Sequence, residues 1–337
     1  MIKLIYKLSL LLVLIGGIGE IAWHSIGFPF YWGNTQLNTK LEILKEEQQS
    51  FNTYFIGSSI TFRQVIPSVF DSLSQGPTKS LNLGVDGCFL PQVFMLLDEL
   101  MKDTTIKYLF VELNSYDHFG PNFRVVDNKY YLSPKWLSKT IPYLWTTSIS
   151  LVQKVGLSGM YVYAYLEKSL GLGMRADFIK QTHTGNRFGG YTLMGKNKDG
   201  FYKLTGEKTK KQKELKELPP TMKNLKAAYQ NAYKKPTQNL IYNKVLSKQW
   251  LTYLQLAESH GIHLFFVLNA VKCVLDSEEE MLGLFYQFPK KNRIDLANPD
   301  RYPAFYEIEN RWDISHLNTK GATIFSKELA VAFNEHR

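Results

Sequence analysis

Residues 53–61 read Thr-Tyr-Phe-Ile-Gly-Ser-Ser-Ile-Thr, and this stretch decides the fold class. The first four residues form a short apolar run, which predicts a buried strand. Gly57 permits a tight turn, and a helical pattern then continues to Leu73. A strand that turns directly into a helix is the repeating unit of α/β proteins, so Ser59 is predicted at the mouth of a helix.

Strands and helices alternate along the rest of the chain. Apolar runs predict strands at residues 80–85, 106–113 and 262–268. Periodic apolar positions predict helices at residues 92–101, 248–259 and 320–334. This alternation predicts an α/β fold, with an open parallel sheet and right-handed crossovers. In such sheets ligands bind at the carboxyl ends of the strands.

The N-terminal segment is strongly apolar and decides the compartment. Its uncharged run, residues 8–19, is short for a membrane span and resembles the apolar part of a signal peptide. No small-x-small cleavage site follows, and Lys7 can extend toward the headgroups, so an uncleaved membrane anchor over residues 1–30 is preferred. A cleaved signal comes second and a buried helix third. Aromatic residues that could form the opposite interfacial belt are Trp23, Phe28, Phe30, Tyr31 and Trp32.

Positive charge before the apolar run places the rest of the chain outside the cytoplasmic membrane, in the periplasm or its equivalent. Residues 31–52 then form a linker. The α/β domain is expected in two pieces, residues 53–130 and 241–337. Between them, residues 131–240 are expected to form a mainly helical insertion that caps the site, with a Lys-rich second half.

The positive charge is concentrated in one segment. Residues 196–235 contain twelve Lys and four acidic residues, and so account for most of the formal net charge of +10. Such a segment suits anionic headgroups or an anionic polymer, and it equally suits a solvated insertion. No nucleic-acid-binding motif accompanies the charge, so nucleic acid is not expected as a partner.

Four short elements carry the chemistry. Ser59 follows the first strand, and Gly87 ends a Gly-containing loop after the second. Asn114 follows the third strand, where its amide could donate to an oxyanion. Asp313 and His316 lie three residues apart just before the last helix, so both side chains can face one pocket. There the His can deprotonate a serine while the Asp orients the imidazole.

Each element alone has an ordinary explanation. A Ser at the start of a helix is usually an N-cap, and an Asn after a strand usually forms a turn. The order and placement of all four are less easily accidental. Together they resemble the conserved blocks of the SGNH/GDSL hydrolase superfamily, over roughly residues 53–117 and 241–337. The most specific piece is Asp-Ile-Ser-His-Leu-Asn, residues 313–318.

The resemblance implies a flavodoxin-like three-layer parallel sheet with Ser59 as nucleophile, His316 as general base and Asp313 as its partner. It also implies an oxyanion hole made by the N–H groups of Ser59 and Gly87 and the Asn114 amide. Three positions depart from the family pattern. Ser58 stands where the Gly-Asp-Ser-Leu motif has Asp, a variant similar to membrane-anchored relatives that acylate envelope polymers. In the Gly-x-Asn-Asp block, Glu112 and Ser115 replace Gly and the final Asp.

The expected function is an ester hydrolase or O-acyltransferase that acts on an acylated glycan or envelope polymer through an acyl-Ser59 intermediate. A membrane protein that donates the acyl group is a further expected partner. The alternative is a catalytically degenerate relative that binds polymer or scaffolds an envelope assembly. No cofactor or metal site is predicted, because Asp117 and His118 have no further ligands at credible spacing. Whether Cys88 and Cys273 pair stays open.

Overall fold

The protein is described by a computed structural model over residues 2–26, 35–47, 50–88, 90–102, 105–113, 132–146, 149–169, 199–202, 212–270 and 278–336. Contacts divide the chain into two compact units. The smaller unit combines Met1–Thr39 with Phe119–Gly190, and the larger combines Lys40–His118 with Tyr191–Arg337. The larger unit contains the sheet and all of the described candidate site residues.

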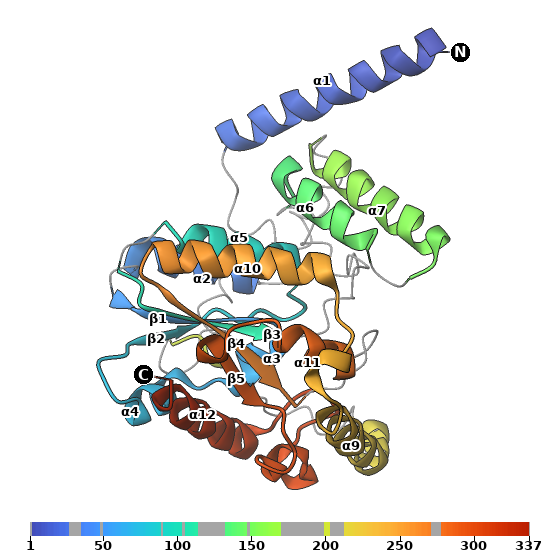
Figure 1. Ribbon diagram of the computed structural model, residues 1–337. Helices are drawn as coiled ribbons and strands as arrows, with labels where there is room; N and C mark the ends of the chain where they lie inside the picture. Colours follow the sequence, from blue (N-terminus) through green and yellow to red (C-terminus); the bar gives the residue numbers. More distant parts are fainter. Residues whose placement is uncertain are drawn as a thin grey trace. The chain divides into compact units, whose positions relative to one another are not determined.

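The sheet of the larger unit has five parallel strands in the order β2-β1-β3-β4-β5 (Figure 1). They are β1 (Thr53–Ile56), β2 (Ser80–Asn82), β3 (Tyr108–Leu113), β4 (His263–Asn269) and β5 (Arg293–Leu296). This confirms the α/β class, and the order is compatible with the flavodoxin-like layout. The edge strand β5 was not predicted. Its Arg-Ile-Asp-Leu sequence alternates polar and apolar residues and is too short to stand out.

Helices cover both faces of this sheet. Around it lie α3 (Ser59–Gln64), α4 (Pro67–Leu73), α5 (Leu90–Leu100), α10 (Lys244–Ser259), α11 (Glu278–Phe285) and α12 (Thr319–Asn334). In Figure 1, α5 and α10 lie on one face and α4 and α12 on the other, which gives three layers. Short 3-10 helices are η4 (Thr237–Asn239), η5 (Lys290–Asn292), η6 (Pro303–Tyr306) and η7 (Ile308–Asn310). The helical pattern expected up to Leu73 is interrupted, because Ile66 is extended and Pro67 starts a new helix.

Consecutive residues of β4 pack against helices on opposite faces of the sheet. Phe265 meets the ring of Phe333 on α12 edge to face, with centroids 5.6 Å apart. Phe266 meets Trp250 on α10, also at 5.6 Å. Since successive side chains of a strand point to opposite faces, an all-apolar strand is what a sheet covered on both sides requires. The apolar runs in the sequence therefore correctly predicted strands that are covered by helices on both faces.

The smaller unit is helical where it is described. It contains α1 (Ile2–Ile26), α6 (Pro134–Leu144) and α7 (Leu151–Ser169). Tyr161 and Ala164 on α7 pack with Leu132, whose carbonyl accepts a hydrogen bond from Lys168 Nζ at 2.8 Å. This agrees with the mainly helical character expected for the insertion at residues 131–240.

Helix α1 covers most of the predicted membrane anchor. Its large apolar side chains from Leu4 to Leu14 are exposed. Nevertheless, no helix within the described ranges has both the length and the apolar character needed to cross a bilayer. The anchor at residues 1–30 therefore stays a prediction. The aromatic residues at 28–32 of its expected belt lie outside the described residues.

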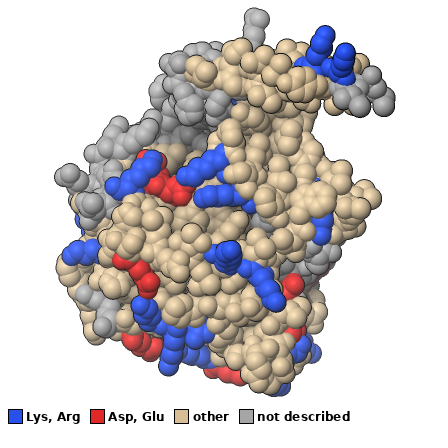
Figure 2. All heavy atoms as spheres, turned by 45° about the horizontal axis from the view of Figure 1, so that its top comes forward, with Lys and Arg blue, Asp and Glu red and all other residues tan. Residues whose placement is uncertain are grey.

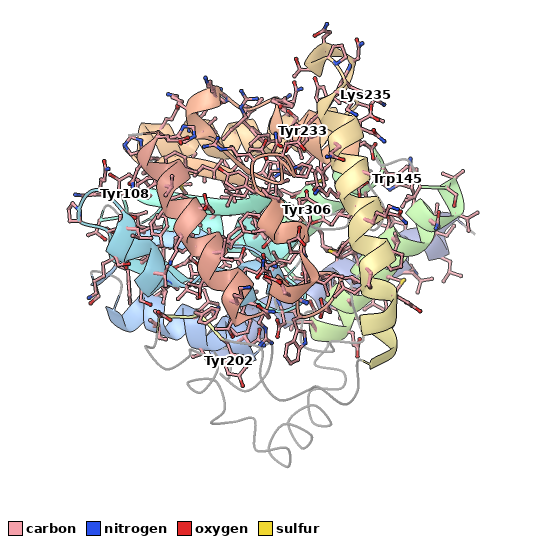
Figure 3. The ribbon with its side chains drawn as sticks, turned by 90° about the horizontal axis from the view of Figure 1, so that it is seen from below. Tyr108, Trp145, Tyr202, Tyr233, Lys235 and Tyr306 are labelled. Carbon is pink, nitrogen blue, oxygen red and sulfur yellow. The ribbon has the colours of Figure 1, made fainter. Side chains whose placement is uncertain are left out.

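The Lys-rich half of the insertion expected at residues 131–240 contains one long helix. By its contacts, α9 (Gln212–Tyr233) belongs to the larger unit. Tyr229 donates a hydrogen bond to the Asn269 carbonyl at 3.1 Å, and Tyr233 donates to Asp295 at 2.7 Å. Figure 3 shows Tyr233 together with Tyr306 in this region. The second half of the predicted 131–240 insertion is thus attached to the end of the sheet. The remaining helix, α2 (Thr35–Glu47), crosses the boundary between the units.

The packing of α12 can be tested with two residues of the same helix. Phe333 is fully buried among aromatic rings, whereas Val331 is 48% exposed. We expect Phe333→Ala to lower the free energy of unfolding by about 3–5 kcal/mol, because it removes the ring and leaves a cavity. Val331→Ala should change it by less than about 0.5 kcal/mol. Chemical denaturation of both variants measures this, and equal effects would contradict the packing described here.

Candidate active site

The nucleophile candidate, Ser59, is the first residue of α3 directly after β1. Ser58 is the N-cap, and its Oγ accepts a hydrogen bond from the Ile60 N–H at 3.2 Å. Ser59 is only partly buried, whereas its neighbours Ser58 and Ile60 are buried. The ordinary N-cap role therefore belongs to Ser58, and the Ser59 side chain is left for another partner.

That partner is His316. The Ser59 hydroxyl lies 2.8 Å from His316 Nε2, although the two residues are 257 positions apart in the sequence. On the other side of the ring, Nδ1 lies 3.0 Å from both carboxylate oxygens of Asp313. If Nδ1 carries the proton and donates to Asp313, Nε2 is free to accept from the serine. The structure thus joins the three predicted residues in one hydrogen-bonded chain.

The carboxylate of Asp313 also shapes its own turn. Its Oδ1 accepts hydrogen bonds from the backbone N–H groups of Ser315 and His316, both at 2.8 Å. The side chain of Asp313 is only 6% exposed, whereas that of His316 is 21% exposed. The turn is therefore rigid on its buried side and accessible at the imidazole. A carboxylate held in this way can orient the ring and stabilise its protonated form.

One departure from the family motif, Glu112, lies against this site. Glu112, near the end of β3, is 3% exposed. Its carboxylate accepts hydrogen bonds from the Ser58 N–H and the Thr61 N–H, both at 3.0 Å, and from the Ser58 hydroxyl at 2.8 Å. The Thr61 hydroxyl donates to it as well. The signal that could have found Glu112 is its charge within the otherwise apolar, buried run of β3.

The predicted second loop packs closely on α3. An added Cβ at Gly84 would lie 2.3 Å from the Phe62 backbone nitrogen, so only glycine fits there. Arg63 binds Asp86 through two hydrogen bonds, of which the shorter, from Nη2, is 2.6 Å. The guanidinium lies 5.0 Å from the ring of Tyr202, which is labelled in Figure 3. These contacts fix the loop that leads to Gly87.

Two of the three predicted oxyanion donors are described. The N–H of Ser59 has no hydrogen-bond partner among the described residues, and neither has the N–H of Gly87. Gly87 is exposed and has φ +65°, a left-handed conformation that favours glycine. The third, Asn114, lies outside the described residues. The described donors are therefore available, as an oxyanion hole requires.

The same loop is supported by a buried lysine. Lys40 on α2 is fully buried, and its Nζ donates to the Gly84 carbonyl and lies 4.2 Å from the Phe62 ring centroid. Burial holds the pKa of Lys40 well below its usual value.

Nearby, burial raises the pKa of the Cys88 thiol, which makes it a poor nucleophile. Cys273 lies outside the described residues, so the question of their pairing stays open.

No three His, Cys, Asp or Glu side chains cluster as metal ligands in the described part of the chain. Asp117 and His118, whose adjacency was noted in the sequence, fall outside it.

Fold and site together define a class: an α/β protein whose parallel sheet carries a Ser-His-Asp chain beyond its carboxyl edge. No protein-family model and no curated protein matches the sequence. The resemblance to SGNH/GDSL hydrolases therefore rests on the motifs quoted above.

The buried charge of Lys40 predicts a pH dependence of stability. Because the pKa of Lys40 is lowered in the folded state, the unfolded chain binds an extra proton between that lowered pKa and the usual value of 10.5. Stability contributed by this group therefore rises with pH across that window and levels off above it. We expect Lys40→Met to remove this rise from the unfolding free energy measured at several pH values. A difference between the two proteins that does not vary with pH would contradict the assignment.

Proposed function

We propose that this protein is a serine-dependent ester hydrolase or O-acyltransferase of the SGNH/GDSL type, working through an acyl-Ser59 intermediate. The observation that carries the proposal is the continuous chain from Ser59 Oγ through His316 to Asp313, at 2.8 and 3.0 Å. Both distances are within the reach that proton transfer requires. A nucleophile, a base and an orienting carboxylate in this order define acyl-transfer chemistry.

In the first half-reaction, Ser59 Oγ attacks the carbonyl carbon of an ester while His316 Nε2 takes the hydroxyl proton. The carbonyl oxygen becomes an oxyanion, which the N–H groups of Ser59 and Gly87 stabilise together with the Asn114 amide. The bond to the leaving alcohol then breaks, and His316 returns its proton to that alcohol. Asp313 stabilises the charged imidazole throughout.

In the second half-reaction, His316 removes a proton from water or from a hydroxyl of a glycan or envelope polymer. The resulting nucleophile attacks the acyl-Ser59 carbonyl, and the proton passes back to Ser59 as its bond to the acyl group breaks. Water as acceptor makes the protein an esterase, and a polymer hydroxyl makes it a transferase. The exposed edge of His316 gives either acceptor access to the base.

We further propose that α1 anchors the protein in the cytoplasmic membrane, with the larger unit outside. The exposed apolar side chains of α1, preceded by Lys3, support this placement. On the face drawn in Figure 2, Lys and Arg side chains lie in several separate groups, some of them beside Asp or Glu. An enzyme anchored at the membrane would meet envelope polymers there, and a membrane acyl donor is the partner that a transferase would need.

The catalytic assignment predicts that Ser59→Ala and His316→Ala each abolish covalent labelling by a fluorophosphonate. In this reaction Ser59 Oγ displaces fluoride from phosphorus and His316 takes the proton. Loss of either residue should slow the reaction by several orders of magnitude, since each is part of one proton-transfer unit. Hydrolysis and transfer on acetylated glycans should fall in parallel.

The matched control is Ser72→Ala, an exposed serine on α4, which should react like the unaltered protein. Circular dichroism should show that all three variants fold. If Ser59→Ala still reacts at the original rate, or if the unaltered protein does not react at all, the polymer-binding scaffold replaces the enzyme.

A further inference from the structure

Two departures from the family pattern contact each other in the structure. Ser58 replaces the Asp of the first block and Glu112 replaces the Gly of the third, 54 positions later. The Ser58 hydroxyl donates to Glu112 Oε1 at 2.8 Å, and the Ser58 N–H donates to Oε2 at 3.0 Å. A carboxylate is thus present beside the nucleophile turn, but it comes from β3.

The carboxylate of Glu112 holds the chain on both sides of Ser59. It binds Ser58 just before the nucleophile and Thr61 two residues after it, through the N–H and the hydroxyl of each. Gly57 completes the fit, since an added Cβ there would lie 2.3 Å from Glu112 Oε2. With residues 58 and 61 held by one rigid strand, Ser59 has little freedom to shift.

The same hydrogen bonds account for the N–H groups at the start of α3. The Ile60 N–H donates to Ser58 Oγ, the Thr61 N–H to Glu112 and the Phe62 N–H to the Ser58 carbonyl at 3.1 Å. Of the four N–H groups from residue 59 to residue 62, only that of Ser59 lacks a described partner. Within the described part of the chain, the arrangement therefore leaves the N–H next to the nucleophile oxygen available to a substrate.

We propose that Glu112 is a positioning residue for Ser59. Its carboxylate fixes the turn so that Ser59 Oγ meets His316 and the Ser59 N–H faces the reacting oxygen. The proposal rests on the proposed function, because it assigns Glu112 a role in the reactivity of Ser59. It also predicts that the turn needs one carboxylate, supplied by position 112 or by position 58 but not by both.

The first test is Glu112→Gln. An amide of the same shape carries only one acceptor oxygen, and its NH₂ group would face donors. The turn should shift, and the second-order rate of fluorophosphonate labelling should fall about 100-fold, the scale expected for a displacement near 1 Å. The control, Glu307→Gln, makes the same change at an exposed position of the same unit and should leave the rate unaltered.

The second test separates positioning from simple damage. Ser58→Asp alone places two carboxylates against each other, and their repulsion should slow labelling. Combined with Glu112→Gln, the new carboxylate faces an amide donor and can still cap α3. The double variant should therefore label at least about tenfold faster than either single variant, whereas independent losses would multiply.

The proposal is overturned if Glu112→Gln labels at the original rate, or if the two single effects simply multiply in the double variant. Amide hydrogen exchange gives a readout that does not need activity. The Ser58 and Thr61 amides should exchange faster in Glu112→Gln than in Glu307→Gln. If the unaltered protein fails to label, the proposed function fails, and exchange still decides whether Glu112 holds the turn; unchanged exchange would overturn that as well.

Discussion

A hydrogen bond between residues 257 positions apart, Ser59 and His316, sets the constraint that the rest of the structure must meet. The serine is held by β1 and α3, and the histidine by the turn before α12. Gln64 at the end of α3 donates to the Ser315 carbonyl at 3.2 Å, and Ser326 on α12 accepts from the Ile66 N–H at 2.8 Å. Ser59 and His316 can meet only if α12 packs against the sheet. The aromatic contacts of that helix with the sheet hold it in this position.

Much of this could be predicted because the signals are local. Apolar runs mark strands buried on both faces, and Asp and His three residues apart mark a single turn. The features that were missed depend on distant partners. Helix α9 has buried residues Leu218, Met222, Leu225 and Tyr229 at helical spacing, but its many lysines concealed them. Its attachment to the sheet through tyrosine hydroxyls has no sequence signature at all.

Glu112 illustrates the same limit at the level of one residue. In the sequence, Glu112 stands where the Gly-x-Asn-Asp block has Gly, and nothing there indicates a role for it. Burial of a carboxylate in a strand also looks unfavourable. Burial is tolerated when hydrogen-bond donors replace the lost water, and four donors from two residues do so here. Those donors lie 51 and 54 positions away, so only the folded chain reveals why the charge is accepted.

The two carboxylates near Ser59 differ in the kind of donor they meet, and this difference separates their roles. Glu112 accepts from backbone N–H groups and hydroxyls, none of which gives up a proton at neutral pH. Asp313 also accepts from backbone N–H groups, but one of its donors is an imidazole that gains charge when Ser59 loses its proton. Asp313 therefore interacts more strongly in the transition state than in the ground state, which is the condition for catalysis. The hydrogen bonds printed for Glu112 involve no group that changes charge in the reaction, so through them it acts on the rate by fixing the geometry of the turn.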